Sequence, residues 1–232
     1  MMPGREQVGT CRVSAQSRFY LVSVLFCAAM VLGGEWAWAI DFTGGEKVRV
    51  RGNANAPLTL VEFSDFTCGY CMKFFKETLP RIQAKYIDTG KIRYIYRDFP
   101  RGTEGAGMIG ALASRCAGDQ GRYWPMHDRL FSSGGRFDSG DVLSYAKSVG
   151  LEQAVFANCL RDGKYRSAIL REKDEAQSMG FRGTPGFVLL RTSDSTGTGS
   201  EPPVMIPGAF PFDVFEEQID QMLLALEPKR KG

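Results

Sequence analysis

The chain has 232 residues, of which 44% are hydrophobic and 24% are charged, as in an ordinary globular protein and unlike a disordered or low-complexity chain. Lys and Arg number 29 against 26 Asp and Glu, without long runs of one sign, so the sequence shows no electrostatic basis for nucleic-acid binding. A single histidine excludes metal sites built from several histidines, which leaves the six cysteines as the feature that points to chemistry.

Residues 1–39 have the pattern of an export signal. Three arginines precede an uncharged run from Phe19 to Gly34, and Ala37 and Ala39 are small residues at the two positions that a signal peptidase reads. The run is shorter than the roughly 20 apolar residues of a membrane-spanning helix, so a membrane anchor is the less favoured alternative. Cleavage after Ala39 predicts a periplasmic or otherwise exported protein with four cysteines, in a compartment where disulfides form.

The first part of the mature chain predicts strands around one helix. Residues 47–51 alternate as in an edge strand, and 58–63 form the short, β-branched apolar run of a buried strand. After Cys71 the apolar residues recur at helical spacing, and Pro80 predicts a kink in that helix. Residues 91–99 predict another strand.

Residues 103–180 predict several short helices, because helical apolar spacing is interrupted there by Gly, Ser and Asp. Strand character returns at 187–191 and 204–206, with a hairpin loop expected over 192–203, and 212–226 has the spacing of a closing helix. The order of elements predicts an α/β protein with one sheet that is interrupted by a helical insertion.

The segment Cys68-Gly69-Tyr70-Cys71 stands where the buried strand ends and the helix begins. The free N–H groups and the positive end of the helix dipole stabilise a thiolate on the first cysteine, and a lower thiol pKa makes that sulfur a better leaving group. Gly69 adds no bulk beside the sulfur, and we expect Gly69 and Tyr70 to contact substrate. A redox pair is the favoured interpretation. The alternatives are a zinc site, which lacks two further ligands at compatible spacing, and an inert disulfide.

Far downstream, Gly183-Thr184-Pro185-Gly186 immediately precedes a predicted strand. Together with the strand–CxxC–helix unit, this segment resembles the thioredoxin superfamily, in which a cis proline faces the CxxC pair. The helical insertion narrows the resemblance to the DsbA-like thiol–disulfide oxidoreductases. Segments that carry this resemblance, within a match from Ala56 to Leu226, are 63–68, 94–100, 115–117 and 124–131.

The resemblance implies a thioredoxin fold with a helical insertion domain, in which residues 40–102 and 181–232 form the discontinuous thioredoxin-fold domain and 103–180 form the insertion. It also implies that Cys68 is the attacking cysteine and Cys71 the resolving one. Pro185 becomes the cis proline, and the backbone of Thr184 becomes a contact for substrate. Glu62 becomes a buried acid that exchanges a proton with the second cysteine. The alternative for Glu62 is a carboxylate on the solvent side of its strand.

Three other features receive structural interpretations. Cys116 and Cys159 lie in separate predicted helices, and a structural disulfide is the economical pairing in an oxidising compartment; two buried thiols are the alternative. The segment 105–110 fits a dinucleotide-binding glycine pattern, but no second βαβ unit supplies the acidic residue that such a site needs. His127 is expected to be a packed or capping side chain, and not a base.

The predicted function is that of an exported dithiol oxidase, which introduces disulfides into exported proteins through Cys68 and Cys71 and is reoxidised by a membrane redox partner. We expect no cofactor, no metal, no nucleic-acid partner and a monomer. One alternative is a disulfide isomerase or reductase, because Gly69-Tyr70 is the dipeptide of DsbC-like isomerases; however, residues 40–56 are too few for the dimerisation domain of those isomerases. The other alternative is a non-catalytic thioredoxin-fold chaperone.

Overall fold

The computed structural model of this protein describes residues 49–194 and 202–226. The predicted export signal lies outside the described residues, as do the start of the predicted edge strand and most of the predicted hairpin loop. In the two described ranges, every helix is too short or too polar to cross a membrane.

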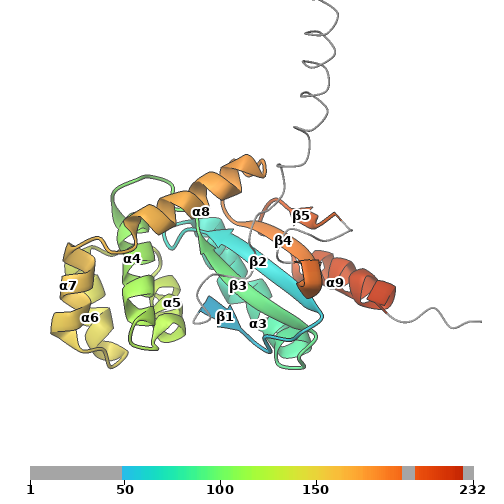
Figure 1. Cartoon of the computed structure of the whole chain (residues 1–232), viewed down its shortest axis with the longest axis horizontal. Helices are drawn as coiled ribbons and strands as arrows, with labels where there is room; N and C mark the ends of the chain where they lie inside the picture. Colours follow the sequence, from blue (N-terminus) through green and yellow to red (C-terminus); the bar gives the residue numbers. More distant parts are fainter. Residues whose placement is uncertain (1–48, 195–201, 227–232) are drawn as a thin grey trace, which may run out of the picture. The chain divides into compact units, whose positions relative to one another are not determined.

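A mixed sheet of five strands, in the order β1-β3-β2-β4-β5, runs through the described part of the chain (Figure 1). The strands are β1 (Val50–Arg51), β2 (Leu58–Ser64), β3 (Ile92–Asp98), β4 (Gly186–Arg191) and β5 (Val204–Ile206). The central strand β2 pairs parallel with β3 and antiparallel with β4, and all of its residues are buried. The continuous apolar run of β2 follows from this burial on both faces. Of the predicted edge strand, Val50 and Arg51 form β1 and pair with Ile95 and Tyr94 of β3.

The helix after β2 changes its geometry along its length. It consists of α2 (Gly69–Lys73), a π-helical segment (Phe74–Thr78), α3 (Leu79–Ile82) and a second π-helical segment (Gln83–Ile87). Pro80 lies in the first turn of α3. Because proline lacks an N–H and its ring clashes with the preceding turn, the regular α-helical bonds are interrupted here. The helix continues past Pro80, with π-helical turns on both sides of α3, and the kink at Pro80 stays a prediction.

The predicted helical insertion between β3 and β4 is confirmed. Its helices are α4 (Ala106–Gly118), α5 (Tyr123–Ser132), α6 (Ser139–Ser148), α7 (Gln153–Arg161) and α8 (Arg166–Ser178). In Figure 1, α8 leads from the other insertion helices back over the sheet, where it contacts β3. The described chain ends with α9 (Phe212–Leu226), which has the predicted bounds.

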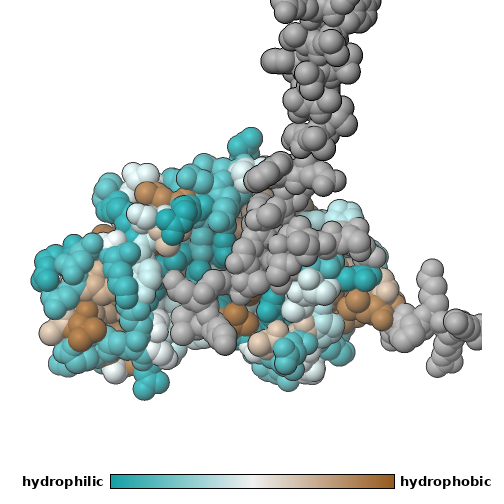
Figure 2. Space-filling model, in the orientation of Figure 1, coloured by the Kyte–Doolittle hydropathy of each residue, from teal (hydrophilic) through white to brown (hydrophobic). Residues whose placement is uncertain are grey.

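The two faces of the sheet bury separate apolar layers, because successive side chains of a strand point to opposite faces. The layer covered by α3 and α9 contains the strand residues Leu58, Leu60, Ile92, Tyr94, Phe187 and Leu189. The layer covered by α8 contains the alternate positions Val61, Phe63, Ile95, Val188 and Leu190. By this alternation Glu62 belongs to the first face, the one toward the helix that follows β2. On the face of the molecule seen in Figure 2, hydrophilic residues predominate over the insertion helices.

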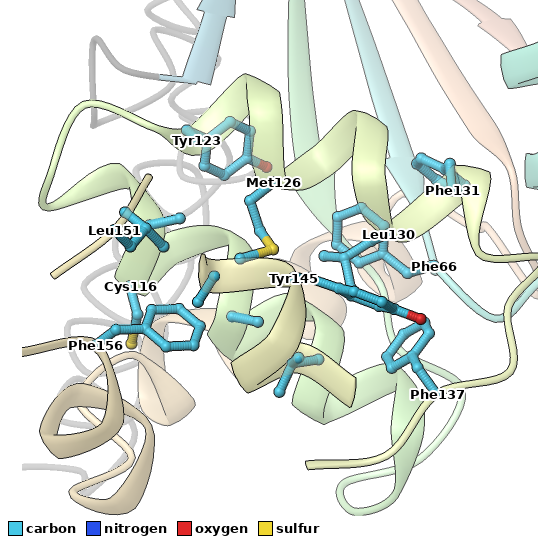
Figure 3. Packing of buried hydrophobic residues seen from close by; sticks show 14 of the residues in the cluster. Phe66, Cys116, Tyr123, Met126, Leu130, Phe131, Phe137, Tyr145, Leu151 and Phe156 are labelled. Atoms are coloured by element: carbon cyan, nitrogen blue, oxygen red, sulfur yellow. The ribbon is translucent and has the colours of Figure 1, made fainter. Parts of the chain in front are cut away.

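The insertion has its own core, and the chain leading to the CxxC pair reaches into it. Phe66, two residues before Cys68, is fully buried; its ring centroid lies 5.0 Å from that of Tyr96 and 4.8 Å from that of Phe131. Figure 3 shows Phe66 beside Leu130 and Phe131 of α5. The position of Cys68 is therefore tied to the packing of the insertion.

A buried ionic cluster joins the insertion to the sheet. Glu172 of α8 accepts hydrogen bonds from the Arg49 guanidinium at 2.7 and 3.0 Å and from the backbone N–H of Asp98 at 2.8 Å. Arg115 of α4 donates to Asp98 at 2.6 Å and pairs with Glu172 at 2.7 Å. Burial alone would raise the pKa of Glu172, but the charges of Arg49, Arg115 and Arg97 outweigh it and lower the pKa to about 2.

Replacing Glu172 should destabilise the fold strongly. Glu172→Ala removes one of the two buried carboxylates that Arg49 and Arg115 share, so we expect the free energy of unfolding to fall by about 3–5 kcal/mol in denaturant titrations at neutral pH. The matched control is Glu175→Ala, which removes the half-exposed partner of Arg97 on the same helix and should cost about 1 kcal/mol or less. Equal losses in the two variants would contradict the prediction.

The same carboxylate should make the fold sensitive to acid. Because the pKa of Glu172 is lower in the folded state than the ordinary value of 4.5, its contribution to stability is present above that value and is lost as the pH falls toward about 2. Denaturant titrations of the wild-type protein across this range measure the loss, and Glu172→Ala should show less of it.

Candidate functional site

Cys68 is the residue that caps the start of α2, and Cys71 lies in its first turn. Both thiols are free, Cys68 is 7% exposed, and Cys71 is fully buried. Of the residues between them, Tyr70 is 71% exposed, and a side chain on Gly69 would meet no other atom within 4 Å. An incoming thiol therefore reaches Cys68 without obstruction from Gly69, while Cys71 is shielded.

The two thiols have opposite electrostatic surroundings. The hydrogen bond with Cys71 lowers the pKa of Cys68 to about 5, helped by Thr184 and by the backbone N–H groups of Cys71 and Tyr70 and opposed by burial. Burial, the hydrogen bond to Cys68 and the charge of Glu62 raise the pKa of Cys71. At neutral pH the reduced pair consequently holds a thiolate at the accessible sulfur and a proton at the buried one.

The segment before β4 faces the CxxC pair. The Thr184–Pro185 peptide bond is cis, and the Cys68 thiol lies 3.3 Å from the carbonyl oxygen of Thr184. Gly186, the next residue, pairs with Phe63 at the end of β2, which brings this segment to the edge of the sheet where Cys68 stands. The structure thus brings together Cys68, Cys71, Thr184 and Pro185 from segments more than 100 residues apart in the sequence.

A hollow of about 240 Å³ adjoins the pair. Its lining residues are Tyr70, Thr184, Pro185, Gly208, Ala209 and Phe210. Phe210 is 41% exposed, so this surface offers apolar contacts and backbone groups to a peptide. The sequence did not indicate that residues 208–210 line this hollow, because nothing in a short loop sequence shows that its aromatic side chain remains exposed. The available signal is the segment Gly208-Ala209-Phe210 between two prolines.

Glu62 is buried beneath the pair, so the alternative of a solvent-facing carboxylate is wrong. It is 1% exposed and accepts a hydrogen bond from the hydroxyl of Tyr94. Burial raises the pKa of Glu62 to about 7, although the hydrogen bond from Tyr94 acts to lower it. A carboxyl with this pKa exchanges its proton readily near neutral pH.

Asp65 organises the loop that leads to Cys68, and sequence analysis missed it. Its carboxylate accepts hydrogen bonds from the N–H and the hydroxyl of Thr67 and from the N–H of Arg101, each at 2.7 Å. The N–H of Cys68 donates to the backbone carbonyl of Asp65 at 3.0 Å. The available signal is an Asp followed two residues later by Thr, a spacing at which an Asp side chain can bond the following backbone.

Two glycines of the segment 105–110, Gly107 and Gly110, lie where a side chain would meet its neighbours. A Cβ on Gly107 would lie 2.9 Å from the carboxylate oxygens of Asp65, and one on Gly110 would lie 2.9 Å from the ring of Phe137 and 3.1 Å from that of Phe66. These glycines let α4 approach the loop before Cys68 closely.

The remaining candidates have structural surroundings. A disulfide joins Cys116 of α4 to Cys159 of α7, as expected. His127 is fully buried among aromatic rings and bonds to the adjacent Asp128 at 2.8 Å; burial lowers its pKa. The described ranges contain no group of three or more His, Cys, Asp or Glu side chains that could hold a metal ion.

The thiolate of Cys68 should be measurable directly. In the reduced protein, ultraviolet thiolate absorbance and alkylation rate should titrate with a midpoint near pH 5. Cys71→Ala removes the strongest stabilising hydrogen bond, so the midpoint should move toward the value of about 8.5 of an ordinary cysteine. Cys68→Ala, the control, should lack the transition near pH 5. An unchanged midpoint in Cys71→Ala would show that the thiolate is stabilised by other groups.

Comparison with solved structures finds the same fold. Alpha-DsbA1 of Wolbachia pipientis is 27% identical, with a TM-score of 0.67 over 77% of this chain and 94% of that one. A thioredoxin-like oxidoreductase of Silicibacter pomeroyi is 26% identical, with a TM-score of 0.64 over 78% and 96% of the two chains. The predicted thioredoxin fold with its helical insertion is confirmed.

Sequence comparisons place the similarity in the same region. A Na⁺/H⁺ antiporter NhaA of Salinispora arenicola is 34% identical over 145 residues, which are 62% of this chain and 22% of the antiporter, so the chain matches about a fifth of that relative. A protein of Rickettsia bellii with the provisional name protein-disulfide oxidoreductase is 24% identical over 65% of this chain and 60% of its own length. The sequence model of the family described as Thioredoxin matches residues 45–191. The chain belongs to this family, and it resembles the DsbA-like thiol–disulfide oxidoreductases, with Cys68 and Cys71 as its CxxC pair.

Proposed function

We propose that this protein is a dithiol oxidase that passes the Cys68–Cys71 disulfide to cysteine pairs of exported proteins. The observation that carries the proposal is the position of Cys68 at the N-terminal end of α2, where the Cys71 thiol and the backbone N–H groups of Cys71 and Tyr70 lower its pKa. A stabilised thiolate favours the reduced form of the pair, and its disulfide is correspondingly a stronger oxidant. The apolar hollow beside Cys68 suits extended, incompletely folded peptides.

The reaction follows from the different exposure of the two sulfurs. A substrate thiolate attacks Sγ of Cys68 in the oxidised pair, the Cys68–Cys71 bond breaks, and the Cys71 thiolate leaves and takes a proton from Glu62. A second substrate thiolate then attacks the substrate sulfur of the mixed disulfide, and Cys68 leaves as a stabilised thiolate. The substrate has gained a disulfide, and the pair has gained two electrons and is reduced.

The setting of this reaction is part of the proposal. An export signal over residues 1–39, cleaved after Ala39, would deliver a monomer to the periplasm or another oxidising compartment. A membrane redox protein would accept the two electrons from Cys68 and Cys71 and return the pair to the disulfide.

The test compares oxidation with isomerisation. The oxidised protein should form disulfides in a reduced substrate, and Cys68→Ser should abolish this activity. The potential of the pair, measured in glutathione buffers, should be less negative than about −200 mV. The double variant Cys116→Ala with Cys159→Ala is the matched control, because it removes the other disulfide and should keep the activity.

Each other outcome points to an alternative. Refolding of a substrate with scrambled disulfides, without oxidation of a reduced one, would favour an isomerase. A potential near that of thioredoxin, about −270 mV, would favour a reductase. Binding of unfolded substrate without any thiol exchange would favour a chaperone.

A further inference from the structure

Glu62 is bound by a neighbouring tyrosine that sequence analysis did not single out. The hydroxyl of Tyr94, on β3, donates to the Glu62 carboxylate, and both side chains are at most 1% exposed. The parallel register pairs Leu60 with Tyr94 and Glu62 with Tyr96, so the Tyr94 ring reaches Glu62 diagonally on the same face of the sheet. Because the carboxyl group is buried, loss of this donor would remove a hydrogen bond from a group shielded from solvent.

The pair lies next to the buried thiol of the redox site. The charge of Glu62 acts on Cys71, whose pKa it raises. The carboxyl group near Cys71 thus accepts its hydrogen bond from the hydroxyl of Tyr94. Burial raises the pKa of Tyr94 well above its ordinary value, so Tyr94 keeps its proton and acts as a donor.

Few charges surround the pair. The titratable or charged groups that face it from the packed elements are Cys68 and Cys71 from the start of α2, Tyr96 from β3, Arg51 from β1 and Tyr123 from α5. The neighbouring β4 and α9 contribute aromatic side chains, such as Phe187 and Phe215. Trp124 of α5 covers the Tyr94 ring at a centroid distance of 5.8 Å. In this apolar surrounding, a single hydroxyl donor has a large effect on the ionisation of a carboxyl group.

We propose that Tyr94 is a positioning residue for proton exchange between Glu62 and Cys71: its hydroxyl holds the carboxyl in place and stabilises the ionised form. This inference rests on the proposed function. When Cys71 leaves as a thiolate, the Glu62 carboxyl gives it a proton and becomes a carboxylate. When the Cys71 thiol attacks a mixed disulfide at Cys68, the carboxylate takes the proton back, and the sulfur of the departing thiol carries the negative charge. Tyr94 donates its hydrogen bond throughout and transfers no proton.

The pH profile of the second step reports this role. Reduced protein is mixed with excess oxidised glutathione, the reaction is quenched with acid, and mass spectrometry follows conversion of the mixed disulfide at Cys68 into the Cys68–Cys71 disulfide. In the wild type, this conversion should become faster with pH around a midpoint near 7, where Glu62 ionises. Tyr94→Phe removes the donor and should move the midpoint upward. If the midpoint rises by about one pH unit, the step at a pH below it should be about tenfold slower than in the wild type, and the rates converge at high pH.

Two matched variants separate this effect from a loss of packing. Tyr96→Phe removes a hydroxyl from an equally buried tyrosine of the same strand; across the described ranges that hydroxyl has no hydrogen-bond partner, so the profile should not move. Glu62→Gln removes the ionising group, and adding Tyr94→Phe to it should cause no further shift with pH.

A third variant covers the case in which Tyr94→Phe does not fold. Tyr94→3-fluorotyrosine, introduced at this position alone, keeps the ring and makes the hydroxyl a stronger donor, so the midpoint should move downward. The inference is overturned by an unchanged midpoint in Tyr94→Phe or, if that variant is unfolded, in the fluorinated protein. It is also overturned by equal slowing at every pH, or by a pH shift that persists in Glu62→Gln. Failure of the proposed function would be recognised by a different result, because the wild-type protein would then not oxidise reduced substrates at all.

Discussion

The site depends on the confinement of β2 between two partner strands. Because β2 is parallel to β3, antiparallel to β4 and buried on both faces, its register cannot slip by one residue without turning Glu62 to the opposite layer. The same strand delivers Cys68 to the start of α2, and its pairing with β4 brings Pro185 to that edge. One strand thus places Glu62 and Cys68 and brings Pro185 beside them.

The chemical difference between the two thiols arises from depth and from the helix terminus. Cys68 stands where N–H groups point at it, and Cys71, one turn later, is enclosed by the insertion core and lies near a carboxyl group. The sulfurs are three residues apart, yet one is held as a thiolate and the other as a thiol. A carboxyl with a pKa near 7 beneath Cys71 gives the buried sulfur a proton donor and acceptor in the working range of such exchange reactions.

The insertion takes part in building the site. Phe66 is packed in the insertion core, Asp65 meets the first turn of α4 at Gly107, and the Glu172 cluster ties α8 and α4 to the strands. The loop before Cys68 is held from both sides, by β2 and by the helices that follow β3. This arrangement explains why small residues are needed at the start of α4, where a glycine-rich pattern otherwise resembles a dinucleotide site.

The sequence by itself determined the elements and the redox pair, because apolar periodicity, CxxC at a strand–helix junction and Thr-Pro before a strand are local patterns. It also identified Cys116 and Cys159 as candidates for a disulfide. Only the tertiary structure decided which polar groups are buried and which of them meet. The hydrogen bonds from Tyr94 to Glu62 and from Arg101 to Asp65 join segments far apart in the chain. The exposure of Phe210 likewise depends on how distant segments pack around it. Such contacts depend on strand register and helix packing, which no local pattern encodes.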